Sequence, residues 1–390
     1  MRVLQIVPSI SLVYGGPSQM VLGLSAALAK AGAEVTILTT DSNGDTGQVP
    51  LDVPLDRPVE QDGYFIRYFR CSPFRRYKFS IDLLRWLAQH SQEFDIAHIH
   101  ALFSPVSSAA AAVARSRKLP YLMRPLGTLD PADLQKKRQL KQVYAALIEK
   151  GNLAGAEAIH FTSSQEAKVS ERFGTKTKDV VIPLGVQLPE VTPGMAKSQL
   201  GLPEDVPILL YMSRIDPKKG LDLLIPALER LLAEGVSFHF VLAGGNPQDP
   251  AYEEQIKQRV RESVLGKVTT IPGFVKGELK AALLQDADLF VLPSYYENFG
   301  IAVAEAIASA TPVVISQGVY IWEDIQTSEA GWVCESEVDS LKSTLREALA
   351  DEGERRRRGE KGKQYAQIHY SWSAIAQQTL ATYQQLLADG

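Results

Sequence analysis

The sequence has 390 residues, more than one hydrophobic core usually serves, so two or three domains are expected. Its 45% hydrophobic and 22% charged residues are typical of a globular protein, and no apolar run of about 18 residues predicts a membrane-spanning helix. The net charge of −4 and the lack of a recognised motif argue against nucleic-acid binding. Residues 1–190 carry 22 Lys and Arg against 18 Asp and Glu, which indicates an anionic partner for the first half.

Two further features predict a cytoplasmic protein. The first residues, MRVLQIVPSI, lack the apolar core and cleavage pattern of a signal peptide. Cys71 and Cys334 are far apart and lack metal-binding spacing, so we expect buried, reduced thiols.

The first half alternates predicted strands with predicted helices. This alternation predicts a parallel sheet covered by helices on both faces. The expected strands are residues 3–7, 34–39, 64–69, 96–99, 121–123, 158–161 and 180–182, and the expected helices are 20–31, 80–89, one ending near 117, and 132–153.

Residues 184–207 are rich in proline and glycine and show no strand, so they are interpreted as an interdomain linker. The alternation then starts again. We therefore predict two Rossmann-like domains, residues 1–188 and 189–371, with the active site in the cleft between them and a helix at 372–390 returning to the first domain. In the second half the expected strands are 208–212, 239–243, 268–271, 289–292, 313–315 and 332–334, and the expected helices are 221–233, 252–264, 277–285, 301–310, 338–350, 354–369 and 372–387.

The stretch 288–315 is the most informative part of the chain, because a loop at the carboxyl end of a strand leads into a helix. The amides of Phe299, Gly300 and Ile301 begin that helix, and such a terminus binds an anion without a metal. Glu297 lies in the loop. Glu305 lies inside an otherwise apolar helix, where a buried carboxylate needs a partner.

Three other loops follow strands of the second half. Residues 213–220 contain Arg214, whose fork could bind two phosphate oxygens, and Lys219, which could add a point charge. The alternative is solvated loop charge. Gly244 would let the backbone approach a ligand closely, and the loop with Phe274 and Val275 could hold a flat base.

The first half offers Gly15 and Gly16 as a second phosphate cradle. The fingerprint G-x-G-x-x-G is absent there, which argues against a dinucleotide. His100 lies at the carboxyl end of a strand, where it could be a site residue or an ordinary core histidine. His98 is expected on the opposite face of that strand.

Together these motifs resemble a retaining glycosyltransferase of family 4, which has the GT-B fold. Arg214 followed by Lys219 and Gly220, and the pair Glu297 and Glu305 around Phe299-Gly300, are the most specific elements. Four further features resemble the same family. They are Gly15-Gly16, the strand ending at His100, Pro312-Val313-Val314, and the final helix that begins at Ser371-Trp372. The segment RPLGTLDP at 124–131 resembles a subgroup that builds bacterial exopolysaccharide or lipopolysaccharide.

The resemblance implies a role for each site residue. The donor would be a nucleotide-diphosphate sugar, best guess UDP-glucose, bound without a metal or other cofactor. Arg214 and Lys219 would neutralise its diphosphate, Glu297 would bind the sugar and Glu305 the ribose. The expected catalytic residues are Glu297, His100, Arg214 and Lys219, and the expected donor-binding residues are Gly15, Gly16, Arg214, Lys219, Gly244, Phe274, Val275, Glu297, Asn298, Phe299, Gly300, Ile301 and Glu305.

The acceptor side departs from the family pattern. Leu126 stands where many relatives carry histidine, so Arg124 or Thr128 is expected to serve the acceptor instead. Relatives usually have glycine where Ala310 stands, a helix-end change expected to matter little, and the segment around Gly318 and Glu323 also departs from the family pattern. The implied acceptor is a saccharide or lipid-linked saccharide of envelope polysaccharide synthesis, and the implied chemistry is front-face transfer with retention. The alternatives are another GT-B enzyme, such as a sugar-nucleotide epimerase or a phosphorylase-like protein, and a non-enzymatic sugar-binding protein.

Basic and aromatic residues alternate over residues 64–86, so this segment is predicted to touch an anionic membrane on its inner face. The alternative is an ordinary amphipathic helix with a solvated basic face.

Overall fold

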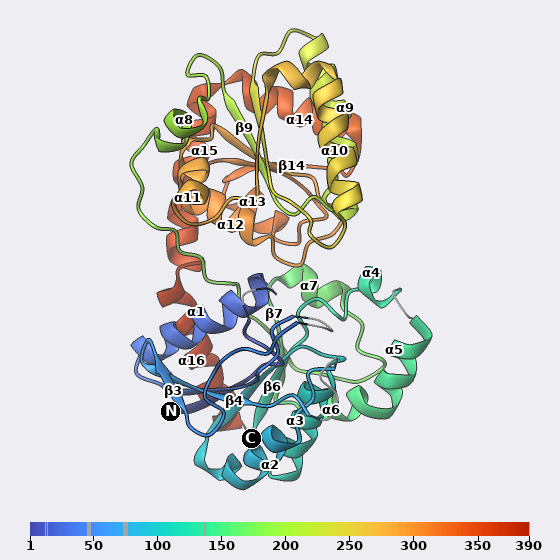
Figure 1. The fold of residues 1–390 in the computed structure, drawn as a ribbon, viewed down its shortest axis with the longest axis vertical. Coiled ribbons are helices and arrows are strands. Elements are labelled where there is room, and N and C mark those ends of the chain that lie inside the picture. Colours follow the sequence, from blue (N-terminus) through green and yellow to red (C-terminus); the bar gives the residue numbers. More distant parts are fainter. Residues whose placement is uncertain (12, 14, 45–47, 73–76, 136–137, 390) are drawn as a thin grey trace. The chain divides into compact units, whose positions relative to one another are not determined.

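The computed structural model describes every residue except 12, 14, 45–47, 73–76, 136–137 and 390. The described chain forms two compact units, residues 1–185 with 372–390, and residues 186–371. Each unit is an α/β sandwich around its own sheet (Figure 1).

The sheet of the first unit has eight strands in the order β3-β4-β2-β1-β5-β6-β7-β8. All neighbours pair in parallel except β3 and β4, which are antiparallel, so the expected parallel sheet has one antiparallel edge strand that the sequence analysis missed. The strands are β1 (Arg2–Ile6), β2 (Glu34–Thr40), β3 (Val59–Gln61), β4 (Tyr64–Phe69), β5 (Ile96–His100), β6 (Tyr121–Arg124), β7 (Ala158–Phe161) and β8 (Asp179–Val181).

Helices cover both faces of this sheet, because alternate strand residues supply two separate cores. Val3 packs with α1 and α16, whereas Leu4 and Ile6 pack with α2 and α3. The helical elements are α1 (Gly16–Lys30), α2 (Ile81–His90), a 3₁₀ turn (Ser91–Glu93), α3 (Pro105–Ser116), α4 (Pro131–Leu134), α5 (Arg138–Tyr144), a π-helix (Ala145–Glu149), α6 (Lys150–Ala154), α7 (Ser164–Val169) and α16 (Trp372–Asp389).

The carboxyl-terminal helix α16 belongs to the first unit and lies along α1 (Figure 1). Its first residue, Trp372, fills the space beside two glycines. A β-carbon would lie 2.4 Å from the indole at Gly23 and 2.2 Å at Gly185. Small residues at these two positions are therefore what let α16 dock.

The helix expected at 132–153 is confirmed from residue 138 onward, where α5, a π-helical turn and α6 follow one another without a break. The structure has a short α4, then α5, one π-helical turn and α6. Pro131 and the side chain of Asp130, which accepts from the amide of Ala132 at 2.8 Å, start the first piece. The π-turn ends at Glu149, whose buried carboxylate bonds to other elements, so tertiary contacts override the helical periodicity.

The sheet of the second unit has six parallel strands in the order β11-β10-β9-β12-β13-β14. The strand order reverses beside β9, so the loops after β9 and β12 leave the sheet next to each other. The strands are β9 (Ile208–Met212), β10 (His239–Ala243), β11 (Thr269–Gly273), β12 (Leu289–Leu292), β13 (Val313–Ser316) and β14 (Gly331–Cys334).

The predicted linker contains a helix that the sequence analysis missed, α8 (Met195–Leu200). Its start is held by Asp286, which accepts from the amides of Gly194 at 2.7 Å and Ala196 at 2.8 Å. The other helical elements of this unit are a 3₁₀ turn (Pro217–Lys219), α9 (Leu221–Ala233), α10 (Pro250–Glu262), a 3₁₀ turn (Val264–Val268), α11 (Gly277–Asp286), α12 (Ile301–Ala308), α13 (Trp322–Thr327), α14 (Val338–Ala350) and α15 (Glu352–His369).

Candidate functional site

The loops after β9 and β12 contact each other in the second unit. The amide of Tyr295 donates to the carbonyl of Lys218 at 2.8 Å. Gly220 has a φ of 74°, and a β-carbon there would lie 2.0 Å from the carbonyl oxygen of Pro293. The close approach of the two loops therefore requires glycine at position 220.

This contact brings two predicted site residues together, because Lys219 forms an ion pair with Glu297. Burial opposes ionisation of Glu297, but the charges of Lys219, Lys218 and Arg214 outweigh it and hold its pKa below the ordinary value. Lys219 is itself buried. The site therefore holds an ionised carboxylate among three cations.

Lys218 is a member of this group that the sequence analysis did not assign. Its ammonium lies 4.9 Å from the centre of the Tyr296 ring. Burial lowers the pKa of Lys218, while the carboxylate of Glu297 opposes that shift. The adjacent pair Lys218-Lys219 in the sequence could have indicated that both lysines belong to this site.

The backbone of Glu297 is held by a segment that departs from the family pattern. Its amide donates to the carbonyl of Gly318 at 2.8 Å, and its carbonyl accepts from the amide of Tyr320 at 2.9 Å. A β-carbon on Gly318 would lie 2.2 Å from the carbonyl oxygen of Ser294. Residues 318–320 therefore position Glu297, a role the sequence did not reveal.

The helix α12 begins at Gly300, whose φ is 81° and which carries no side-chain cap. Within the part of the chain that the structure describes, no protein group accepts a hydrogen bond from the amides of Phe299, Gly300 or Ile301. The ring of Phe299 is buried against Tyr370, with ring centres 5.2 Å apart. The helix start is thus anchored while its amides remain available to an anion. Asn298 is the residue that links Glu297 to this helix start.

Glu305 is 8% exposed and forms an ion pair with Lys280 of α11. This lysine is the partner that the buried carboxylate required, and the sequence analysis did not identify it. Burial raises the pKa of Glu305 even though Lys280 opposes the shift. The pair lies on the α11–α12 side of the same unit.

Two other predicted loop residues differ in exposure. Phe274 follows β11 and is 78% exposed, whereas Val275 is buried. Gly244 has a φ of 143°, and a β-carbon there would lie 1.9 Å from the carbonyl oxygen of Ser213. Gly244 is thus required for the packing of the β10 loop on the β9 loop. The guanidinium of Arg214, in the β9 loop, donates to the side-chain oxygen of Gln248, in the β10 loop, at 3.2 Å.

In the first unit His100 lies in the core, and its ring reaches no surface. Its Nε2 pairs with Oε1 of Gln5 at 2.7 Å. The expectation that His98 faces the opposite side is wrong: the two rings stack with centres 4.5 Å apart, because residues two apart in a strand share a face. The predicted contact of His100 with the sugar is therefore not supported by this geometry.

The two histidines belong to a buried chain of polar groups that reaches α16. Nδ1 of His98 lies 2.7 Å from the hydroxyl of Tyr383, and its Nε2 lies 3.1 Å from Nδ1 of His160. Burial lowers the pKa of His98 and His100 well below the ordinary value and that of His160 to about 3. Burial therefore favours the neutral form of these three histidines.

The predicted acceptor residues lie at the end of β6. Arg124 is 4% exposed, and burial lowers its pKa to about 10 although Glu166 opposes the shift. Thr128 donates its hydroxyl to the carbonyl of Pro125 at 2.8 Å. Arg124 is therefore inside the unit, and Thr128 is engaged in its own turn. Gly15 and Gly16 lie at the start of α1, where Gly15 has a φ of 66°.

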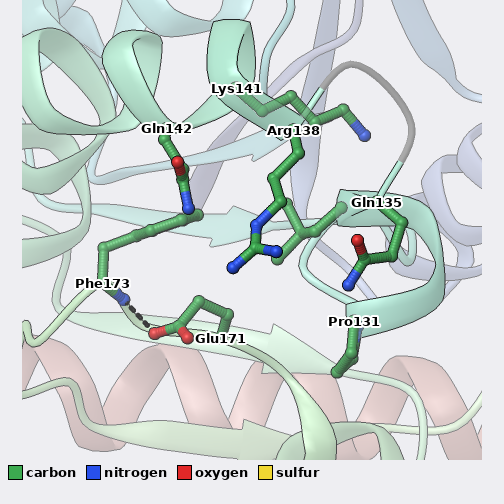
Figure 2. A pocket seen from close by; sticks show the side chains of 8 residues that line it. Pro131, Gln135, Arg138, Lys141, Gln142, Glu171 and Phe173 are labelled. Carbon is green, nitrogen blue, oxygen red and sulfur yellow. Dashed lines mark hydrogen bonds between the residues drawn. The ribbon is translucent and has the colours of Figure 1, made fainter.

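The first unit also contains a pocket of about 190 Å³ that the sequence analysis missed (Figure 2). It lies beside the 124–131 segment. Lys141 at its wall forms an ion pair with Asp133 at 2.7 Å, and the amide of Phe173 donates to Glu171 at 2.6 Å. The lining residues are Pro131, Leu134, Gln135, Arg138, Lys141, Gln142, Glu171 and Phe173.

The membrane contact predicted at 64–86 stays a prediction, and residues 73–76 of that segment lie outside the described residues. Tyr68 and Phe69 are buried in the cores. Trp86 is covered by the guanidinium of Arg67, 5.0 Å from its ring centre, and by the stacked ring of His90. Phe65, Tyr77 and Ile81 of the same segment are exposed, so packing accounts for only part of the alternation of basic and aromatic residues.

None of the described helices has the length and apolarity needed to span a bilayer. In the described ranges, no group of three or more His, Cys, Asp or Glu side chains is arranged as a metal site.

Comparison with known proteins places this geometry in a family. Residues 15–185 match the family model "Glycosyl transferase 4-like domain", and residues 195–365 match "Glycosyl transferases group 1". D-inositol 3-phosphate glycosyltransferase of Xylanimonas cellulosilytica is 28% identical over 95% of this chain and 92% of its own length. Glycogen synthase of Mycobacterium tuberculosis is 26% identical over 95% and 91%.

Solved structures agree with this fold. Sucrose-phosphate synthase of Thermosynechococcus elongatus is 25% identical and superposes with a TM-score of 0.77 over the whole of both chains. HepE of Anabaena, solved with UDP and glucose, is 17% identical with a TM-score of 0.73 over 98% of this chain and 99% of its own.

Two Rossmann-like units, with a cationic site at the strand ends of the second, define an enzyme of the GT-B class. The chain belongs to glycosyltransferase family 4. It is a glycosyltransferase that acts with a nucleotide-sugar donor.

Proposed function

We propose that this enzyme transfers a hexose, with retention of configuration, from UDP-glucose to a saccharide or lipid-linked saccharide of envelope polysaccharide synthesis. The observation that carries the proposal is the ion pair of Lys219 and Glu297, with Arg214 beside it and the amides of α12 at the same edge of the sheet.

The chemistry follows from charge. A nucleoside diphosphate leaves with its negative charge developing on phosphate, so catalysis needs fixed positive charge there. Lys219 and Arg214 would supply cations, and the amides of Phe299, Gly300 and Ile301 would donate hydrogen bonds. When the diphosphate of the donor pairs with Lys219, the carboxylate of Glu297 becomes free to accept hydrogen bonds from sugar hydroxyls. Front-face attack, with the leaving phosphate as base, is the mechanism that the family resemblance implies.

The other half of the donor fits groups in the same unit. Glu305 with Lys280 would bind the ribose hydroxyls, since the carboxylate accepts and the ammonium donates. The exposed ring of Phe274 would stack on the base. UDP is our choice of nucleotide because HepE, which shares the fold, was solved with UDP and with UDP-glucose. We propose that no metal is required, because protein cations and amides meet the diphosphate.

The acceptor side belongs to the first unit in this proposal. Arg124 and Thr128 at the end of β6 remain the candidate acceptor residues, with Arg124 acting from inside the unit. The pocket of the same unit, with Arg138 on its wall, offers a second polar surface for the acceptor.

The test is release of nucleoside diphosphate from UDP-, GDP- and ADP-sugars, with and without a chelator and a saccharide acceptor. We expect release from UDP-glucose that a chelator leaves unchanged and that Glu297→Ala abolishes. Release only from another nucleotide would overturn the donor choice, and loss on chelation would overturn metal independence. No release from any donor would contradict the site assignment.

A further inference from the structure

Exposed apolar side chains gather on one segment of the first unit. Of the thirteen large hydrophobic residues exposed in the described chain, four lie within nine residues. Leu140 is 65% exposed, Val143 57%, Leu147 79% and Ile148 40%. Single exposed apolar residues are normal on a protein surface, but a contiguous group marks an interaction site.

The helical spacing of this segment puts Glu149 inside and four large apolar residues outside. Ala145, Glu149 and Leu153 are buried at intervals of four. The carboxylate of Glu149 accepts from the amide of Phe103 at 2.8 Å and from the hydroxyl of Ser108 at 2.7 Å. This network fixes the rotation of the π-helix, so Leu147 cannot turn inward. The exposed side of this helix therefore carries large apolar residues beside its charged ones, which an ordinary solvated helix face does not.

The charges on the segment have one sign. Arg138 and Lys150 are exposed, and Lys141 is partly exposed. From 138 to 150 the only carboxylate is Glu149, which is buried. A second copy docked about a two-fold axis would bring these like charges together. A lipid surface with anionic headgroups complements both the apolar and the basic side chains.

We propose that the segment 138–150 is the surface by which this enzyme lies on a membrane that contains anionic lipid. The apolar residues enter the headgroup region, and Arg138 and Lys150 meet lipid phosphates. The pocket of Figure 2 shares Arg138, Lys141 and Gln142 with the segment, so a lipid-linked acceptor would meet the first unit there. Only this last consequence rests on the proposed function.

The experiment is co-sedimentation of the full chain with vesicles of equal parts phosphatidylglycerol and phosphatidylcholine, and with vesicles of phosphatidylcholine alone. We expect binding to the mixed vesicles that weakens with salt. The variant L140S/V143S/L147S should lower the partition coefficient about tenfold or more, and R138Q/K150Q about fivefold per charge. The matched control, V264S/I368S, removes two equally exposed apolar residues from the second unit and should bind like the wild type.

Retained thermal stability would show that the variants are folded, and retained release of UDP from UDP-glucose is expected only of L140S/V143S/L147S and of the control V264S/I368S. Wild-type protein that does not bind the mixed vesicles, or a triple variant that binds as well as the control, would overturn the proposal. A concentration-dependent dimer that the triple variant abolishes, without vesicle binding, would assign the surface to a second copy instead. Vesicle binding needs no donor, so failure of the proposed function leaves this result readable.

Discussion

The ion pair of Lys219 and Glu297 yields the sharpest prediction, because the two partners have different proposed roles. Lys219 would neutralise the diphosphate, and Glu297 would bind the sugar hydroxyls. The substitution Lys219→Met keeps the length of the side chain and removes its charge. The Lys219 side chain is 9% exposed and that of Glu297 is 23% exposed, so the carboxylate is left in a largely buried place. Removing one partner of a fully buried pair costs 3–5 kcal/mol. Because Lys218 and Arg214 remain nearby, we expect a loss of about 2 kcal/mol in the free energy of unfolding.

Turnover should respond differently from stability. Loss of a cation that meets the leaving diphosphate should lower kcat for donor cleavage by about 10²–10³-fold. The charge of Lys219 is also one of the interactions that overcome burial and hold the pKa of Glu297 low. In the variant that pKa rises, so the acid limb of the kcat/KM profile should move to higher pH.

The assay is UDP release at a series of pH values, with urea unfolding measured on the same samples. The double variant Lys219→Met/Glu297→Gln should regain stability, because no charge is left without its partner, and should remain inactive. Lys342→Ala is the matched control, since Lys342 pairs with Glu234 at 3.1 Å in the same unit and is 20% exposed. Turnover of Lys219→Met within threefold of the wild type, or an unmoved acid limb, would refute the reasoning.

Three further predictions concern binding, backbone strain and pH. Phe274→Ala should weaken UDP binding by roughly tenfold in calorimetry, since base stacking contributes about 1–3 kcal/mol, while Val264→Ala should have no effect; equal affinities would remove Phe274 from the base site. Gly220→Ala should lower stability to urea by more than about 2 kcal/mol because its β-carbon would strike Pro293, whereas Gly235→Ala, with a φ of 82° and open space around it, should cost about 1 kcal/mol; similar losses would contradict the steric argument. The pKa of His98, His100 and His160 is lowered in the folded state, so below pH 6.5 the unfolded chain binds protons that the folded chain does not. Their share of the stability is lost as the pH falls, at about 1.4 kcal/mol per pH unit for each histidine. His160→Gln should therefore make the decline in stability between pH 6.5 and 5 shallower by about that amount. An unchanged slope would show that other groups set the pH dependence.

Local pattern was enough to predict most of the second unit. The apolar runs at 208–212 and 289–292 are predicted as strands because each is a short run of apolar residues bounded by turn residues and too short for a buried helix. The start of α12 at Ile301 was predicted from the change of residue type alone. Glu305 was expected to need a partner for the same kind of local reason, since a buried carboxylate is costly wherever it lies.

Tertiary structure decided which residues meet. Lys280 and Glu305 are 25 residues apart, and only the packing of α11 on α12 pairs them. The same holds for residues 318–320, which bind the backbone of Glu297 through contacts that no spacing reveals.

The sequence by itself determined the class of fold, the two units and the residues that carry charge at the strand ends, because these depend on periodicity and residue type over short stretches. The structure decided that His100 is a core residue and that the helix from residue 138 onward contains a π-turn that leaves Leu147 exposed. Both outcomes depend on partners far along the chain, Gln5 for the histidine and Phe103 and Ser108 for Glu149. A residue's own neighbours in sequence fix its local conformation, whereas its burial is set by whatever the rest of the fold brings against it.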